Sequence, residues 1–309
     1  MSAAEPPPKV LKAYGALPGA DQVVEPPTLD GWRPKLVATD LDGTLLDSAG
    51  EVSRRTRAAL TACWDAGIPV VGVTGRGPRL LASVRQALDG RGIAVLAQGG
   101  FVVDLERDEV LRTVGLPRTQ AAAVIEAIEE VAGELIVAVE GASEQVGATL
   151  GTHVPLRVQH GFDWPYPEPS DILPRHEVLP DGPVLKVFLR SARLDQHELL
   201  ARAQRVVDSA DAEVTHAGLG FIEVLPPGIT KASGLAVALG RYGVGLGDVL
   251  VFGDMPNDLP MIAAVTEAGG RAVAVANAHA AVRAAAPEVT SGHDVDGVAR
   301  YLEAVLADV

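Results

Sequence analysis

Short apolar runs with no polar alternation recur along the chain, and each is followed by turn residues and a segment with helical spacing. The runs are residues 35–39, 68–73, 93–97, 249–252 and 271–275. Strands without polar alternation are buried on both faces, as in a parallel sheet that helices cover on each side. The pattern therefore predicts an α/β fold with a doubly wound parallel sheet.

Apolar positions three and four residues apart fill most of the intervals between these runs and predict helices there. Helices are expected at residues 54–66, 78–88, 232–242, 256–264, 278–285 and 295–307, with a hairpin at 101–114. The two blocks 34–115 and 226–309 together form the predicted core.

Residues 116–225 lie between these blocks and follow a different order of elements. The pattern predicts helices at 119–131 and 194–209 and strands at 136–139, 184–189 and 221–225. A mixed segment that interrupts a parallel sheet is typical of an inserted α+β cap domain. Residues 141–180 show no clear period, and both a functional loop and further strands fit them.

The first 33 residues are rich in Pro, Ala and Glu, with three consecutive prolines from Pro6 and two from Pro26. This composition predicts a flexible arm outside the catalytic fold. The chain start lacks the basic and apolar regions of a secretory signal, and no apolar run reaches the ~18 residues that span a bilayer. We therefore expect a cytoplasmic protein.

Charge and cysteine content exclude several classes of function. The chain has 309 residues and a formal net charge of −14. This charge disfavours nucleic acids and anionic membranes as partners, and it is compatible with binding a divalent cation. Cys63 is the only cysteine, which excludes an intrachain disulfide and a thiolate metal cluster.

Polar residues follow the predicted strands at the points where ligands of open parallel sheets bind. Asp40 and Asp42 follow the first strand, Thr74 follows the second, and Asp254 follows the strand at 249–252. Lys231 adds a cation at the start of a predicted helix. If these strands are neighbours, the side chains converge at one edge of the sheet.

Each of these residues also has a local interpretation. An Asp-x-Asp pair is common in solvated turns, and Thr74, Asp254 and Asn257 are all suited to helix capping. Lys231 opposes the helix macrodipole, which favours contact with an anion, although an exposed lysine is the usual explanation.

Taken together, the groups match the needs of phosphoryl transfer. A carboxylate nucleophile that approaches a phosphate meets like-charge repulsion, which a lysine and a cation such as Mg²⁺ offset. A second, protonated carboxyl group can donate its proton to the leaving alkoxide. Aspartate is an established nucleophile for phosphoryl groups.

The ordered motifs resemble the haloacid dehalogenase superfamily. They are DLDGTLLD at residues 40–47, VGVTGR at 71–76, Lys231 and FGDMPND at 252–258. GITKASGLAVAL, AVAVANA and DGVARYL are similar to the Cof-type phosphatase branch, whose members carry an inserted α+β (type IIB) cap. The resemblance covers the two core blocks and implies a Rossmann-like core and a Mg²⁺-dependent phosphatase for a small phosphorylated metabolite.

The resemblance implies a role for each carboxylate at the strand ends. Asp40 would be the nucleophile and a Mg²⁺ ligand, and Asp254 would be the other carboxylate ligand. Asp42 would act as general acid and base and would offer its backbone carbonyl to the metal.

The remaining motif residues would hold the phosphoryl group. Thr74, the backbone of Gly75 and Lys231 would contact it directly. Asn257 and Asp258 would orient phosphate, Lys231 or metal-bound water. Gln98 follows the third strand where many relatives have Asn, a difference that affects the cap hinge or the substrate contacts.

The resemblance does not define the substrate or the oligomeric state. Relatives act on sugar phosphates, pyridoxal phosphate and flavin-type phosphomonoesters. Trp164 and Tyr166 would either stack on a substrate ring or anchor a loop, and Lys186 would contact a polar group. A phosphomutase with the same chemistry, a non-catalytic phospho-ligand-binding protein and a receiver-type signalling domain are the alternatives.

Overall fold

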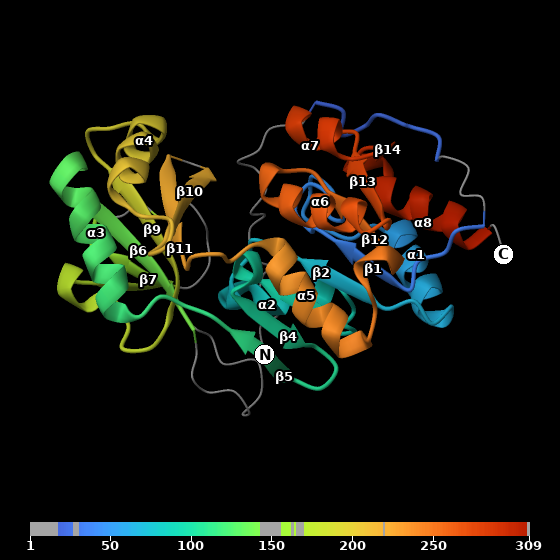
Figure 1. Cartoon of the computed structure of the whole chain (residues 1–309), viewed down its shortest axis with the longest axis horizontal. Coiled ribbons are helices and arrows are strands. Elements are labelled where there is room, and N and C mark those ends of the chain that lie inside the picture. Colours follow the sequence, from blue (N-terminus) through green and yellow to red (C-terminus); the bar gives the residue numbers. More distant parts are fainter. Residues whose placement is uncertain are drawn as a thin grey trace, which may run out of the picture. The chain divides into compact units, whose positions relative to one another are not determined.

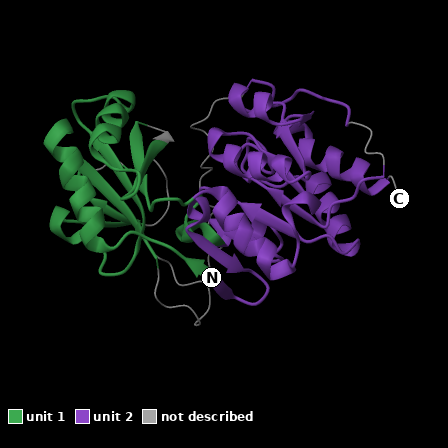
Figure 2. Ribbon diagram, viewed as in Figure 1, with its two compact units in different colours: residues 1–10, 76–81, 112–229 green, residues 11–75, 82–111, 230–309 purple. Residues whose placement is uncertain are grey.

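The computed structural model describes residues 18–26, 31–142, 156–161, 164, 170–218 and 220–307. The described chain divides into two compact units (Figure 2). The inserted unit contains Arg76–Leu81 and Arg112–Ile229, and the core unit contains the other described residues. No helix among the described residues is long and apolar enough to cross a membrane.

The core unit is built on a sheet with the strand order β14-β13-β12-β1-β2-β3-β4-β5 (Figure 1). The strands from β14 to β3 are parallel, and β4 is antiparallel to β3. The bounds are β1 (Leu36–Thr39), β2 (Val70–Val73), β3 (Ile93–Leu96), β4 (Phe101–Asp104), β5 (Glu109–Thr113), β12 (Val249–Gly253), β13 (Arg271–Val275) and β14 (Glu288–Thr290). Every residue of β1, β2, β3 and β12 is buried, so the predicted α/β fold with a doubly wound parallel sheet is confirmed.

Helices cover both faces of this sheet. They are α1 (Arg54–Asp65), α2 (Leu81–Ala87), α5 (Lys231–Tyr242), α6 (Leu259–Glu267), α7 (Ala280–Ala285) and α8 (Gly297–Ala307). The connections from β1 to β2 and from β12 to β13 run in opposite directions along the sheet. Because parallel crossovers are right-handed, they place α1 and α6 on opposite faces. Helix α8 packs against α1, while α5 and α7 pack against α6.

The inserted unit has a separate sheet with the order β10-β11-β9-β6-β7-β8. Its strands are β6 (Leu135–Gly141), β7 (Leu156–Gln159), β8 (Ser170–Leu173), β9 (Val184–Ser191), β10 (Glu213–Gly218) and β11 (Phe221–Leu225). Helices α3 (Arg118–Ala132) and α4 (Gln196–Val206) pack against each other and share one apolar cluster with the sheet (Figure 1). The opposite face carries Phe188, Phe221 and Trp164.

Four strands are present that the apolar pattern did not predict: β7, β8, β10 and β14. Strands β8, β10 and β14 lie at sheet edges. Edge strands need less apolar sequence because one side of the strand has no sheet neighbour. Strands β7 and β8 lie within residues 141–180, so the described part of that stretch contains strands.

Part of the predicted arm is attached to the core unit. The backbone N–H groups of Gly292 and Asp294 donate to the carbonyls of Gln22 and Ala20, at 2.8 and 3.0 Å. The backbone N–H of Val24 donates to the Ser291 hydroxyl at 2.9 Å. Residues 18–26 are therefore held against the segment that precedes α8, whereas residues 1–17 lie outside the described residues.

Candidate active site

The site is built where three neighbouring strands end. β12, β1 and β2 are adjacent and parallel, and Thr39 pairs with Phe252 at the end of the β1–β12 ladder. The backbone N–H of Asp40 continues this ladder by donating to the Phe252 carbonyl at 3.0 Å. Between β1 and β12 the winding of the sheet reverses, which is where open α/β sheets bind ligands.

Three carboxylates gather at this edge. Oxygen atoms of Asp40, Asp254 and Asp258 lie within 4.8 Å of one another. Their residues are 4%, 2% and 0% exposed. Buried carboxylates at such spacing repel one another unless cations compensate their charge. The cluster is therefore stabilised by a nearby positive charge or by protonation of a carboxyl group.

Lys231 supplies one positive charge at the centre of the cluster. Its ammonium Nζ lies 2.7 Å from Asp40 Oδ1 and 2.6 Å from Asp258 Oδ1. Lys231 is the first residue of α5, whose start is closed by a capping box between Thr230 and Ser233. The capping box fixes where the helix begins and thereby directs the buried lysine between the two carboxylates.

The carboxylate of Asp258 is held by hydrogen bonds on both oxygens. Oδ1 accepts from Lys231, and Oδ2 accepts from the backbone N–H groups of Asp254 and Met255, both at 2.9 Å. A β-carbon at Gly253 would lie 2.6 Å from the Asp258 carboxyl carbon, so glycine is needed there. Asp258 belongs to the acidic cluster, but its oxygens orient Lys231 and the turn that carries Asp254.

The turn after β1 places Asp42 beside this cluster. The Leu41 carbonyl accepts backbone hydrogen bonds from Thr44, Leu45 and Leu46, at 3.3, 3.0 and 2.9 Å. Gly43 has φ +79°, and a β-carbon there would overlap the Asp254 carboxylate. The turn is therefore tight, and Asp42 within it is half-buried.

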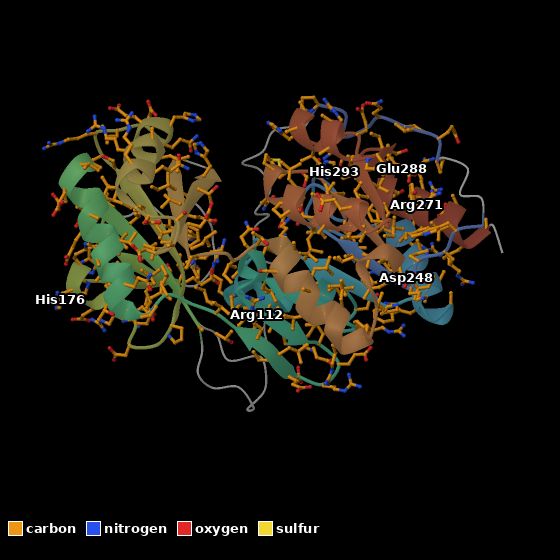
Figure 3. The ribbon with its side chains drawn as sticks, in the orientation of Figure 1. Arg112, His176, Asp248, Arg271, Glu288 and His293 are labelled. Carbon is orange, nitrogen blue, oxygen red and sulfur yellow. The ribbon has the colours of Figure 1, made fainter. Side chains whose placement is uncertain are left out.

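Three residues that the sequence did not single out support this turn. The Thr44 hydroxyl donates to Asp254 Oδ1 at 3.1 Å. The Asn277 side-chain amide donates to the Gly43 carbonyl at 2.7 Å and accepts from the backbone N–H of His293 at 3.0 Å. His293 is labelled in Figure 3, and its ring nitrogen Nδ1 lies 2.8 Å from the Leu46 carbonyl. Asn277 follows the apolar strand β13, so the signal that identified Asp40 and Asp254 also marks Asn277.

Burial and mutual repulsion raise the pKa values of the cluster. Burial, opposed by Lys231 and reinforced by Asp258 and Asp42, raises the pKa of Asp40 from 3.8 to about 7. Burial and the neighbouring charges of Asp40 and Asp258 raise the pKa of Asp254 well above 3.8. Burial alone would lower the pKa of Lys231, but Asp258 and Asp40 outweigh it and raise the pKa, so the lysine stays charged.

Thr74 and Gly75 follow β2 beside the cluster-bearing strands. Thr74 is buried, its backbone N–H donates to the Val95 carbonyl at 2.8 Å, and its carbonyl accepts from the Gln98 N–H at 3.2 Å. A β-carbon at Gly75 would lie 2.9 Å from the Gln98 amide nitrogen. The Asn257 side-chain amide donates to the Gln98 Oε1 atom at 3.2 Å. Gln98 therefore links the loops of Thr74 and Asn257.

The residues suggested for substrate contact have partners in the inserted unit. Trp164 stacks on Phe221 and meets Phe188 edge-on, with ring centroids 5.6 and 5.1 Å apart. Lys186 is 3% exposed and its Nζ lies 2.9 Å from Glu223 Oε1. Tyr166 lies outside the described residues. These contacts fit the interpretation of Trp164 as a loop anchor, and Lys186 would have to leave Glu223 to bind substrate.

The donor set fits a hard divalent cation. Asp40 and Asp254 offer carboxylate oxygens, and the turn that contains Asp42 and Gly43 is closed against Asp254. Carboxylate and carbonyl oxygens are the ligands of Mg²⁺ and Ca²⁺, whereas thiolate and imidazole ligands select other metals. Burial, and after it the charges of the neighbouring carboxylates, raise the pKa of both carboxyl groups, and a bound cation would oppose both effects.

Comparisons with known proteins agree with this geometry. A family model described as haloacid dehalogenase-like hydrolase matches residues 37–302. A 5-amino-6-(5-phospho-D-ribitylamino)uracil phosphatase of Bacillus subtilis is 25% identical over 289 residues, covering 88% of this chain and 98% of the relative. A phosphoglycolate phosphatase of Methanothermobacter thermautotrophicus is 29% identical over 265 residues, covering 86% and 96%.

Solved structures show the same fold. A haloacid dehalogenase-like hydrolase from Bacteroides thetaiotaomicron aligns with a TM-score of 0.68 and 27% identity, covering 88% of this chain and 99% of that one. A sugar phosphatase of haloacid dehalogenase subclass IIB aligns with a TM-score of 0.68 and 19% identity, covering 87% and 97%. The matches span both units of the described chain.

Proposed function

The chain belongs to the haloacid dehalogenase-like hydrolases, in their Cof-type branch, and on that premise we propose that it is a Mg²⁺-dependent phosphatase for a small phosphorylated metabolite. The observation that carries the proposal is the buried Lys231 ammonium between Asp40 and Asp258, with Asp254 beside them. Relatives named as phosphatases match almost their full length to this chain, which supports the same reaction class.

Asp40 forms the covalent intermediate in this proposal. One oxygen of its carboxylate attacks the phosphorus of the ester, and the bond between phosphorus and the alkoxy oxygen breaks. Asp42 donates its proton to that alkoxide, so the alcohol leaves neutral. Splitting the hydrolysis into two displacements replaces one difficult step by two easier ones.

Asp42 reverses its role in the second step. It accepts a proton from a water molecule as the water oxygen attacks phosphorus, and the bond to the Asp40 oxygen breaks. Inorganic phosphate leaves, and Asp40 returns to the carboxylate form. The turn around Gly43 holds Asp42 close to Asp40 through both steps, as general acid–base catalysis requires.

The phosphoryl group is held by residues on separate loops. The ammonium group of Lys231 stabilises the negative charge of the phosphoryl oxygens. Thr74 and the Gly75 backbone donate hydrogen bonds to the same oxygens. Asp258 keeps Lys231 in place, and Asn257 steadies the loop after β12. Asp40, Asp254 and the Asp42 backbone carbonyl would hold Mg²⁺, which supplies positive charge to the phosphate when bound.

Substrate identity is proposed only by class. The sequence resemblance and the two curated phosphatases favour a small phosphomonoester, such as a sugar phosphate, pyridoxal phosphate or a flavin-type compound. A phosphomutase would use the same residues and return the phosphoryl group to the substrate. A phospho-ligand-binding protein without turnover would keep the site but release no phosphate.

The test is a screen of the purified protein against a panel of phosphomonoesters, with release of inorganic phosphate as the readout. We expect release that requires Mg²⁺, stops with a chelator, and is lost in Asp40→Asn while the variant stays folded. Isomerised substrate without free phosphate would show a mutase. Chelator-resistant turnover would reject the proposed mechanism.

A further inference from the structure

Besides the pair of Lys186 and Glu223, the inserted unit contains a buried ion pair between Arg79 and Glu140. Arg79 Nη1 is 2.6 Å from Glu140 Oε2, and the Arg79 backbone N–H donates to Glu140 Oε1 at 3.3 Å. The Arg79 side chain is 8% exposed and that of Glu140 is 0% exposed. Removing one partner of such a pair leaves an uncompensated buried charge, so the two residues depend on each other.

Gly77 and Trp164 pack closely around this ion pair. A β-carbon at Gly77 would overlap the Glu140 carboxylate, so only glycine lets the backbone approach. The guanidinium carbon of Arg79 also lies 5.6 Å from the centre of the Trp164 ring. Glu140 therefore contacts two points of one short backbone segment, and Trp164 packs on the same guanidinium.

The position of Arg79 in the chain gives the pair its significance. Arg76–Leu81 belongs to the inserted unit, although the residues on either side of this segment belong to the core unit. The boundary falls between Gly75 and Arg76, directly after the residues assigned to phosphoryl binding (Figure 2). The backbone that leaves Thr74 and Gly75 is thus anchored within a few residues on β6, through Glu140.

We propose that Arg79 is a positioning residue for the phosphoryl site, acting through its ion pair with Glu140. The pair fixes the segment that follows Thr74 and Gly75, and so keeps their hydroxyl and N–H groups where a phosphoryl group needs them. Arg79 itself touches neither substrate nor metal. Because this inference rests on the proposed function, its test measures the binding of inorganic phosphate, which has no organic group to contact the inserted unit.

The experiment compares matched variants by calorimetric binding of inorganic phosphate in saturating Mg²⁺. Glu140→Gln keeps the shape of the side chain and removes its charge, and Gly77→Ala displaces the same carboxylate without changing any charge. Glu223→Gln is the control, because Glu223 also pairs with a buried cation on a strand of the same sheet, but its partner Lys186 lies within that sheet. Thermal unfolding is measured for every variant.

We expect Glu140→Gln and Gly77→Ala to weaken phosphate binding by about tenfold, because displaced contact groups lose most of their effect. Glu223→Gln should change phosphate affinity less than about twofold, even where its melting temperature falls as much as that of Glu140→Gln. Arg79→Lys keeps the charge but replaces the planar guanidinium by an ammonium group, and its phosphate affinity should lie between those of the wild type and Glu140→Gln.

Two results would overturn the inference. One is wild-type phosphate affinity in folded Glu140→Gln or, if that variant does not fold, in Gly77→Ala and Arg79→Lys. The other is an equal loss of affinity in Glu223→Gln, which would mean a general loss of stability. Failure of the wild-type protein to bind phosphate at all would instead contradict the proposed function.

Discussion

At the residue scale, the site is a balance of buried charges. Three carboxylates surround one lysine, so the described cluster keeps an excess of negative charge. Both carboxylate oxygens of Asp258 accept hydrogen bonds, one from Lys231 and the other from two backbone N–H groups. Asp40 and Asp254 are therefore the carboxylates better suited to bind a cation. Burial in the first place, and then the neighbouring carboxylates, raise the pKa of both groups.

Asp254→Asn tests the assignment of Asp254 as a metal ligand. An amide is a weaker ligand for Mg²⁺ than a carboxylate, so we expect the Mg²⁺ concentration for half-maximal phosphatase activity to rise by about tenfold or more. Asp248→Asn is the control. Asp248, labelled in Figure 3, directly precedes β12, the strand that Asp254 follows, and it makes an exposed ion pair with Lys35. An unchanged Mg²⁺ requirement in Asp254→Asn would contradict the assignment.

Gly43→Ala tests whether activity depends on the close approach of the Gly43 backbone to the Asp254 carboxylate. We expect a loss of activity of about a hundredfold, because the new β-carbon displaces a carboxylate as well as straining a positive φ. Gly133→Ala is the matched control, since Gly133 has φ +78° and open space around its β-carbon. It should lower stability by about 1–3 kcal/mol and leave kcat unchanged. Steady-state kinetics and chemical denaturation separate the two effects.

At the element scale, the candidate site residues follow strand ends, and other loops support them. The turn after β1 receives support from the residue after β13, through the Asn277 amide on the Gly43 carbonyl. The start of α5 is fixed by its own capping box, and this fixes Lys231. The turn after β1 is thus supported by a segment distant from it in sequence, whereas Lys231 is placed by the start of its own helix.

Asn277→Asp tests whether the hydrogen bond from Asn277, which lies after β13, supports the turn around Gly43. The carboxylate can still accept from the His293 N–H but cannot donate to the Gly43 carbonyl, and it adds charge near the cluster. We expect a loss of about 1–3 kcal/mol in the free energy of unfolding and a lower kcat. Asn277→Ala, which loses both hydrogen bonds without the charge, should keep the stability loss. Wild-type kcat in both variants would show that the turn does not depend on Asn277.

At the scale of the whole molecule, the acidic cluster links stability to pH and to metal. The folded-state pKa of Asp40 is about 7 against 3.8 for the free group, so folding takes up a proton between these values. A group with a raised pKa stabilises the fold fully below its unfolded pKa, and this contribution is lost as pH rises through the folded pKa. Asp254 adds to the same trend.

We therefore expect the melting temperature in chelator to fall as the pH rises from about 5 to about 8. Saturating Mg²⁺ should reduce this slope, because the cation stabilises the ionised carboxylates and binds only the folded state. Asp254→Asn should also flatten the slope in chelator, since it removes one of the titrating groups. A melting temperature in chelator that rises with pH over this range would contradict the charge balance described above.

The sequence by itself determined the parallel core and the motif residues. Buried strands such as β1, β2 and β12 need continuous apolar runs, and the polar residues after them mark the ligand edge. Both signals are local, so they can be read without coordinates. The edge strands β8, β10 and β14 give no such signal because little of their sequence must be apolar.

Only the tertiary structure decided which groups support the motif residues. Three such contacts join residues that are far apart in the sequence. Asn277 and Gly43 are 234 positions apart, Glu140 and Arg79 are 61 apart, and Asp258 and Lys231 are 27 apart. Their partners are set by how strands and helices pack, and no periodicity within either segment encodes such a meeting. Local patterns select the elements and the reactive groups, whereas the contacts that hold those groups in place form only when distant elements come together.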